Sequence, residues 1–214
     1  MNITNITGID FKATPIKIYT TDYFIPTNEI KNLKKICCYK DRPDNNVKLS
    51  KNMNVLKHKK LKNLNQLFKK VANHYFKNVL SLKNNFVMTS SWSSLAKKGD
   101  CHHTHNHPNI IFSLIYYVTS NNGKLVVGNT KSSIQENLNF DYEIDKYNIY
   151  NSSSWTIEPR KGDIIAILGD LVHRTLPHEG DQDRIIIGAN YFLDGYIGLH
   201  NDRYSAFKIK TSGV

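Results

Sequence analysis

The sequence is poor in cysteine and contains no long apolar segment. Its 214 residues include three cysteines, Cys37, Cys38 and Cys101, and no run of eighteen apolar residues. A membrane-spanning helix needs about 20 predominantly apolar residues, so no membrane span is expected. Adjacent cysteines rarely pair with each other. An odd count, together with an N-terminus that lacks a basic and apolar leader, predicts a reducing, cytoplasmic location.

Acidic residues and arginine are also scarce. Lys and Arg number 29 against 18 Asp and Glu, the formal net charge is +11, and most of the cations are lysine. Such an excess permits an anionic partner such as nucleic acid. We favour a solvated lysine-rich surface instead, because the lysines occur among many asparagines and isoleucines, as an AT-rich genome would encode. Arginine also does not alternate with aromatic residues, as it does on surfaces that stack single strands.

Helical spacing of apolar residues is confined to the N-terminal part of the chain. Residues 27–37 place apolar side chains at steps of three residues, which predicts a helix. The longest predicted helix covers residues 55–80, with lysines on its other face. Its apolar stripe consists of Leu61, Leu64, Leu67, Phe68, Val71, Tyr75 and Val79. Residues 14–24 are typical of a strand, and residues 40–52, rich in Asp and Asn around a proline, predict a loop.

After residue 82 the sequence is typical of a β-protein. Short segments rich in β-branched and aromatic residues alternate with turn residues. These segments are residues 86–92, 110–118, 123–128, 154–159, 162–169 and 184–193. Consecutive short strands packed by one or two helices favour a jelly roll. We therefore expect one mainly β domain over residues 1–214, with an N-terminal strand and helical support in 1–85 and a jelly-roll core in 86–200.

Two connections between these strands are informative. The dipeptide Asn122-Gly123 predicts a hairpin that joins residues 110–118 to residues 123–128. Residues 129–154 form a long polar insertion, and an insertion of that length inside a domain usually has a function. We expect this insertion and the segment around Trp92 to border a substrate entrance.

Four of the nine histidines lie within six positions: His102, His103, His105 and His107. Imidazole is the commonest protein ligand of transition metals. Residues two apart on an extended chain point to the same side, so either His103 with His105 or His105 with His107 could bind one ion. His173, which follows another apolar segment, is the candidate third ligand. The sequence therefore favours a metal site over a cluster of surface histidines.

Arg184 begins the last apolar segment, eleven residues after His173. A cation inside a barrel is costly unless it is paired. The planar guanidinium can hold a carboxylate by two hydrogen bonds. We expect Arg184 to bind a carboxylate of a ligand; the alternative is an arginine at a strand end that reaches solvent.

The order and spacing of these motifs resemble a known family of enzymes. They are Trp92, Gly99, HNHPN at 105–109, YYV at 116–118, PRKGD at 159–163, His173 and RI at 184–185. This pattern resembles the Fe(II)- and 2-oxoglutarate-dependent (2OG-Fe(II)) oxygenases. It is closest to small members with a His-x-His-Pro motif from marine bacteria and their phages. The resemblance covers roughly residues 86–192 and implies a double-stranded β-helix, the cupin-like form of the jelly roll.

The resemblance also implies cofactors and site residues. Iron would bind to His105, His107 and His173, with His107 at the position where most relatives have Asp or Glu. Arg184 would bind the far carboxylate of 2-oxoglutarate, and the protein would hydroxylate a small-molecule or peptide substrate.

Three further positions follow from the same resemblance. Either Tyr116 or Tyr117 would help to bind that carboxylate, and only one can, since neighbours on a strand face opposite ways. Asn190 would point into the barrel near the cosubstrate.

Two alternatives remain open from the sequence. One is a three-histidine dioxygenase of the cupin type that does not use 2-oxoglutarate, in which Arg184 would bind a substrate carboxylate. The other is a basic nucleic-acid-binding protein whose histidines hold a structural metal. The sequence also leaves the oligomeric state open, although an exposed edge strand near the N-terminus could support a homodimer.

Overall fold

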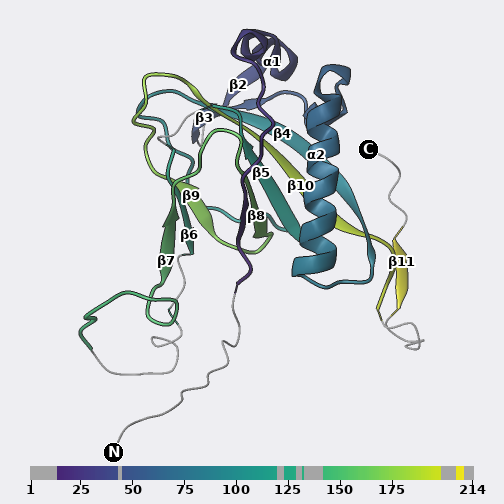
Figure 1. Ribbon diagram of the computed structural model, residues 1–214, viewed down its shortest axis with the longest axis vertical. Coiled ribbons are helices and arrows are strands. Elements are labelled where there is room, and N and C mark those ends of the chain that lie inside the picture. Colours follow the sequence, from purple (N-terminus) through teal and green to yellow (C-terminus); the bar gives the residue numbers. More distant parts are fainter. Residues whose placement is uncertain are drawn as a thin grey trace, which may run out of the picture.

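Two β-sheets face each other, and helices cover the outer face of the larger one (Figure 1). The computed structural model describes residues 14–42, 45–119, 123–128, 132, 142–198 and 206–209. Within these ranges, no helix is both long enough and apolar enough to cross a membrane.

The larger sheet has eight strands among the described residues, in the order β1-β8-β5-β10-β4-β3-β2, with β11 paired to β10. All paired strands within this sheet are antiparallel. The strands are β1 (Lys17–Tyr19), β2 (Tyr39–Arg42), β3 (Asn45–Ser50), β4 (Asn85–Ala96), β5 (Phe112–Tyr117), β8 (Ile164–Leu168), β10 (Arg184–Ile197) and β11 (Phe207–Ile209).

The smaller sheet consists of β7 (Ser154–Ile157), β6 (Leu125–Gly128) and β9 (His173–Thr175), in that order. An isolated antiparallel bridge between His105 and His173 adds one more chain segment at its edge. Apolar side chains of β5 and β8 pack against those of β6 and β7 between the two sheets. This arrangement is the predicted jelly roll, in which each sheet buries one face against the other.

The helices lie on the opposite face of the larger sheet. They are η1 (Thr27–Glu29), α1 (Ile30–Cys37), η2 (Val55–Lys57), η3 (Lys59–Leu61), α2 (Lys62–His74) and the π-helical turn η4 (Tyr75–Val79). The predicted apolar stripe is buried: Leu64 and Phe68 have no exposed surface, and Phe68 contacts Tyr116 edge to face. The predicted helix over 55–80 therefore consists of the 3₁₀ turns η2 and η3, the α-helix α2 and the π-helical turn η4.

Period-2 alternation on β5 separates the two cores. Phe112, Leu114 and Tyr116 face the helices, whereas Ile115 and Tyr117 face the smaller sheet. The same alternation continues across the sheet, because Tyr117 is paired with Ile186 and Ile115 with Gly188. One face of the larger sheet therefore forms a floor beneath the smaller sheet.

Two local predictions were wrong. Residues 40–52 contain the antiparallel strands β2 and β3 rather than a loop, and β3 pairs with β4, so tertiary pairing overrides the turn-forming composition. The predicted hairpin is also absent: β5 pairs with β8 and β10, whereas β6 pairs with β7 and β9. β5 and β6 therefore belong to different sheets, and residues 120–122 between them lie outside the described residues.

Candidate metal centre

Three histidines meet between the two sheets. His105, His107 and His173 each offer a ring nitrogen, and these atoms all lie within 4.8 Å of one another. The backbone brings two of them together: His105 N donates to His173 O at 2.9 Å, and His173 N donates to His105 O at 2.8 Å. The third is held by its own backbone, because His107 N donates to Gly169 O at 2.8 Å. The convergence therefore follows from the pairing of the 105–107 segment with β9 and its preceding loop.

An oxygen atom faces the Nδ1 of each ring. The distance is 2.8 Å from His105 Nδ1 to His103 O and 2.8 Å from His173 Nδ1 to Leu171 O. His107 Nδ1 lies 2.7 Å from Ser113 Oγ and 3.0 Å from Asn190 Oδ1. A carbonyl oxygen only accepts hydrogen bonds, so Nδ1 carries a proton in His105 and His173, and in the neutral ring the lone pair is then on Nε2. This is the tautomer that a metal-binding imidazole with an Nδ1 partner adopts.

Burial keeps two of these imidazoles neutral. Loss of hydration lowers the pKa of His107 to about 4, with a smaller contribution from neighbouring His105. Loss of hydration also lowers the pKa of His173 to about 3, and the two other imidazoles lower it further. Metal ions bind the neutral form of imidazole. Both rings are therefore in the ligating form at neutral pH.

A pocket extends from the three histidines toward the start of β10. Trp92, Ile115, Leu125 and Ile186 form its apolar walls, and no aspartate or glutamate is among the described residues that line it. Its polar lining includes Tyr117, Thr175 and Arg184. The same pocket is therefore lined by the three histidines, a guanidinium and apolar side chains.

Arg184 is a buried cation that forms no ion pair with the acidic residues that the structure describes. Its side chain is 4% exposed. One guanidinium nitrogen donates to Thr175 Oγ1 at 3.0 Å, while Nη1 is buried without a hydrogen-bond partner. Burial lowers the pKa of Arg184, which measures the cost of keeping this charge away from water. Such a group calls for an anion in the pocket.

The two neighbouring tyrosines have different surroundings. Tyr117 lines the pocket with Arg184. Tyr116 lies on the other face of β5, where its hydroxyl donates to Tyr23 O at 2.9 Å and its ring packs in the helical core. Tyr116 therefore does not reach the pocket, and the predicted choice between the two falls on Tyr117.

Asn190 points to the inner face of the larger sheet, as the sequence predicted. Its side chain contacts His107 and Ser113 and does not line the pocket with Arg184. Asn190 is paired with Ser113 across β10 and β5, on the same face of the sheet as Gly188 and Ile115. Its side chain lies against His107, and its proximity to the cosubstrate stays a prediction.

Sequence reasoning missed Ser113 and Thr175, both of which contact predicted site residues. A signal for each was present. Ser113 is the polar residue within the apolar segment 110–118, and Thr175 lies two positions after His173, on the same side of an extended strand.

Comparison with known proteins agrees with this geometry. Residues 90–190, a little under half of the chain, match the family model described as "Putative 2OG-Fe(II) oxygenase". The matched range contains the three histidines, the buried arginine and Asn190. Residues 90–190 are therefore similar to this 2OG-Fe(II) oxygenase family. The match supports the sequence-based prediction of an Fe(II)- and 2-oxoglutarate-dependent oxygenase.

Solved structures with little sequence identity share the fold. The α-ketoglutarate-dependent carbocyclase SnoK from nogalamycin biosynthesis is 11% identical, with a TM-score of 0.59 over 87% of this chain and 82% of its own. A prolyl hydroxylase from Trichoplax adhaerens, in complex with a hypoxia inducible factor peptide, is 12% identical, with a TM-score of 0.56 over 83% of each chain.

HygX from Streptomyces hygroscopicus, bound to nickel, 2-oxoglutarate and hygromycin B, is 10% identical, with a TM-score of 0.53 over 85% of this chain and 84% of its own. The likeness to these structures shows the double-stranded β-helix fold. No curated protein shows significant sequence similarity to the chain.

Proposed function

We propose that His105, His107 and His173 hold the iron and that the enzyme hydroxylates a small molecule or a peptide. Three neutral imidazoles with their Nδ1 atoms bonded to oxygens are a donor set that ferrous iron accepts. When bound, iron and 2-oxoglutarate supply the oxidising chemistry: one oxygen atom of O₂ enters a C–H bond, and the other enters succinate as CO₂ is released. The protein supplies binding, orientation and exclusion of water.

The buried, unpaired Nη1 of Arg184 is the observation that carries this proposal. A carboxylate that accepts from Nη1 would satisfy both the unmade hydrogen bond and the uncompensated charge. 2-Oxoglutarate has two carboxylates separated by an apolar chain, and the pocket is lined by the three histidines, a guanidinium and apolar side chains. We therefore assign the far carboxylate to Arg184, with Tyr117 beside it.

The protein side chains have separate tasks in this proposal. Thr175 Oγ1 orients the guanidinium through its bond with Arg184. Trp92 and Ile186 exclude water from the region between the carboxylate site and the histidines. Trp92 also packs edge to face on His107, with ring centroids 5.5 Å apart, and so restricts the rotation of that ring.

Two solved structures of this fold indicate the substrate class. HygX is bound to hygromycin B and the Trichoplax enzyme to a peptide, so this fold accepts both small molecules and peptides. A cytoplasmic location, a homodimer formed through the edge strand and an origin in marine bacteria or phages stay predictions.

Anaerobic titration tests the proposal. Fe(II) and 2-oxoglutarate are added without oxygen to the wild type, to Arg184→Met and to His173→Ala, and the visible charge-transfer band of the chelate is recorded. We expect a band in the wild type, a loss of 2-oxoglutarate affinity of at least 10-fold in Arg184→Met, and no iron binding in His173→Ala. Arg160→Met, which removes an exposed arginine, is the matched control and keeps the wild-type band.

The outcomes test 2-oxoglutarate binding and the metal ligands separately. A wild type that binds iron without producing the band would contradict 2-oxoglutarate binding at this site and favour the three-histidine dioxygenase. Unchanged iron affinity in His173→Ala would contradict the ligand assignment. Urea unfolding of the metal-free Arg184→Met variant shows whether the fold is intact, since removal of a buried charge without a carboxylate partner should cost less than about 1 kcal/mol.

A further inference from the structure

His107 differs from the other two histidines in what holds its Nδ1. His105 and His173 use backbone carbonyls, of His103 and Leu171. His107 instead contacts two side chains, Ser113 Oγ at 2.7 Å and Asn190 Oδ1 at 3.0 Å. The orientation of this one imidazole therefore depends on residues that substitution can change.

The three side chains form a closed triangle whose donors can be assigned. Ser113 Oγ donates to Asn190 Oδ1 at 2.7 Å. A hydroxyl has one hydrogen, so Ser113 Oγ can then only accept from His107. Asn190 Oδ1 is also an acceptor. His107 Nδ1 must therefore carry the proton, because the other tautomer would place its lone pair against two acceptors.

The sheet builds this triangle. Ser113 on β5 and Asn190 on β10 are directly opposite partners, so their side chains lie on the same face. The pairing of β10 with β4 shifts register between Asn190 and Tyr191, and such a bulge alters the direction of side chains beside a site. The two polar side chains thus lie on the inner face of the larger sheet, in contact with His107.

We propose that Asn190 and Ser113 are positioning residues that hold His107 as the Nδ1–H tautomer, with its Nε2 toward the metal. This inference rests on the proposed role of His107 as an iron ligand. The amide oxygen is an uncharged acceptor, so it orients His107 without adding negative charge beside the metal site.

Tautomer-specific ¹⁵N NMR of the imidazoles tests the assignment directly. Spectra are recorded on the metal-free and Zn(II)-loaded protein, since Zn(II) is diamagnetic. The wild type is expected to show His107 with a protonated Nδ1 in both states. In Asn190→Leu with Ser113→Ala, which has neither acceptor, a substantial fraction of the metal-free His107 should change to the Nε2–H tautomer.

Metal affinity gives the second measurement, by competition of Co(II) with a chelator. Loss of an outer partner of a ligating histidine typically costs 10–100-fold in affinity, so Asn190→Leu and Ser113→Ala should each bind Co(II) at least 10-fold more weakly. Asn190→Asp keeps an acceptor and should stay within about 3-fold of the wild type. Ser154→Ala, which removes an exposed hydroxyl from β7 outside the pocket, is the matched control and should bind like the wild type.

The outcomes separate this inference from the proposed function. If His173→Ala still binds Co(II) with wild-type affinity, the metal site itself is wrong. If His173→Ala loses the metal but the Leu and Ala variants keep both the Nδ1–H tautomer and the wild-type affinity, the positioning role is overturned and the metal site stands. Should Asn190→Leu fail to fold, Ser113→Ala and Asn190→Asp decide the question alone.

Discussion

Two neutral imidazoles buried in an apolar site make the metal-free protein sensitive to mild acid. Their folded-state pKa values are about 4 for His107 and about 3 for His173. An unfolded histidine titrates near 6.5. Between these values the unfolded chain binds protons that the folded chain does not, so the free energy of unfolding rises with pH up to about 6.5 and then levels off.

We expect the metal-free protein to lose stability as the pH falls from 6.5 toward 4. The slope should approach about 1.4 kcal/mol per pH unit for each of the two histidines. Urea unfolding at a series of pH values measures it. His173→Gln should remove part of the slope, because glutamine does not titrate. His58→Gln, at the N-cap of η3, serves as the control. An equal slope in wild type and His173→Gln would refute this origin of the acid sensitivity.

Within the strand β5, alternate side chains face either the core beneath the helices or the pocket. Tyr116 belongs to the core beneath the helices and Tyr117 to the pocket, although they are consecutive. Successive side chains of a strand point to opposite faces of the sheet, and this alone directs the two rings to different surroundings.

The pair Tyr116→Phe and Tyr117→Phe is expected to separate these roles. Tyr116→Phe loses the bond to Tyr23 O, which should lower the free energy of unfolding by about 1 kcal/mol and leave 2-oxoglutarate affinity unchanged. Tyr117→Phe should weaken 2-oxoglutarate binding and change stability less. Urea unfolding and the charge-transfer titration measure both quantities, and the reverse pattern would contradict the assignment.

Gly188 on β10 leaves the space in which Trp92 of β4 lies. A Cβ at Gly188 would meet the indole of Trp92 at 2.5 Å. The two residues are directly paired across the strands, and Trp92 in turn packs on His107. The contact between these strands therefore controls the position of a proposed ligand.

We expect Gly188→Ala to destabilise the protein by about 1–3 kcal/mol, the usual cost of overpacking, and to weaken metal binding. In combination with Trp92→Phe, which has the smaller ring, the two losses should be less than additive. Urea unfolding of the four proteins in this cycle gives the coupling. Strict additivity would show that the indole does not respond to the added methyl group.

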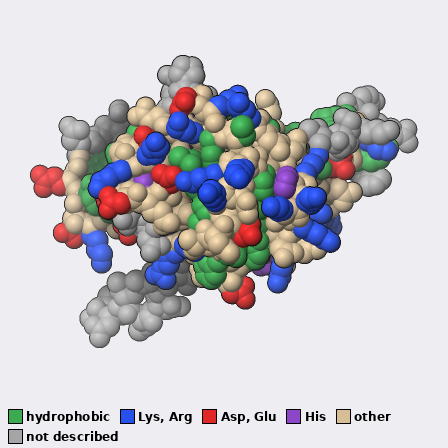
Figure 2. Space-filling view, turned by 90° about the horizontal axis from the view of Figure 1, so that it is seen from above, with side chains coloured by type: hydrophobic (Ala, Val, Ile, Leu, Met, Phe, Trp, Pro, Cys, Tyr) green, Lys and Arg blue, Asp and Glu red, His purple; other side chains and the backbone are tan. Residues whose placement is uncertain are grey.

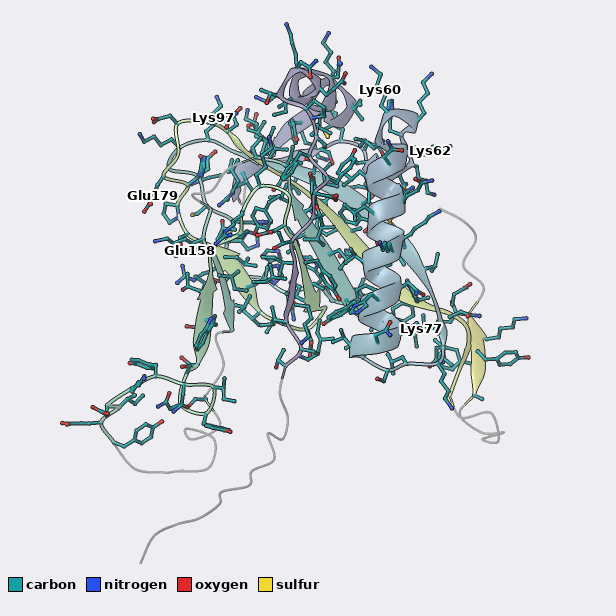
Figure 3. The ribbon with its side chains drawn as sticks, in the orientation of Figure 1. Lys60, Lys62, Lys77, Lys97, Glu158 and Glu179 are labelled. Atoms are coloured by element: carbon teal, nitrogen blue, oxygen red, sulfur yellow. The ribbon has the colours of Figure 1, made fainter. Side chains whose placement is uncertain are left out.

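The charge of the whole molecule is unevenly distributed along the chain. Residues 45–99 contain twelve lysines and no acidic residue. Lys60 and Lys62 lie at the end of α2 that is near α1 (Figure 3), and the view onto that end shows more Lys and Arg than Asp and Glu (Figure 2). The first turn of α2 contains no acidic residue, although the positive end of the helix dipole is there.

Lys62→Glu is therefore expected to raise the free energy of unfolding by about 0.5–1 kcal/mol at low salt, because it reduces repulsion and complements the helix dipole. The melting temperature of the wild type should rise between 10 and 200 mM NaCl, as screening weakens the repulsion, and that of Lys62→Glu should rise less. Thermal unfolding at several salt concentrations measures both. A wild-type melting temperature that falls with salt would show that attractive pairs dominate.

Patterns within short stretches of the sequence predicted the features that depend on neighbouring residues along the chain. The stripe of Leu64, Phe68 and Val71 predicted a buried helix, since periodicity is a property of the sequence itself. The alternation of apolar segments with turns predicted a jelly roll. The spacing of His105, His107 and His173 predicted a group that the backbone does bring together.

Strand pairing was beyond these local patterns. The hairpin expected at Asn122-Gly123 had a good turn signal, but the competing pairs of β5 and β6 lie far away in the sequence. Residues 40–52 have the composition of a loop and become strands because β4 offers an edge to β3. Such pairings depend on which segments meet in space, which no window of the sequence contains.

The sequence by itself determined the chemistry available to this protein: the histidines, a scarce arginine at the start of an apolar strand, and a lysine-rich helix. Only the tertiary structure decided which tyrosine faces the pocket and that Asn190 contacts His107 and Ser113. The reason is that these choices depend on the register between β5 and β10, and a shift of one residue in that register would exchange the two faces of every strand it joins.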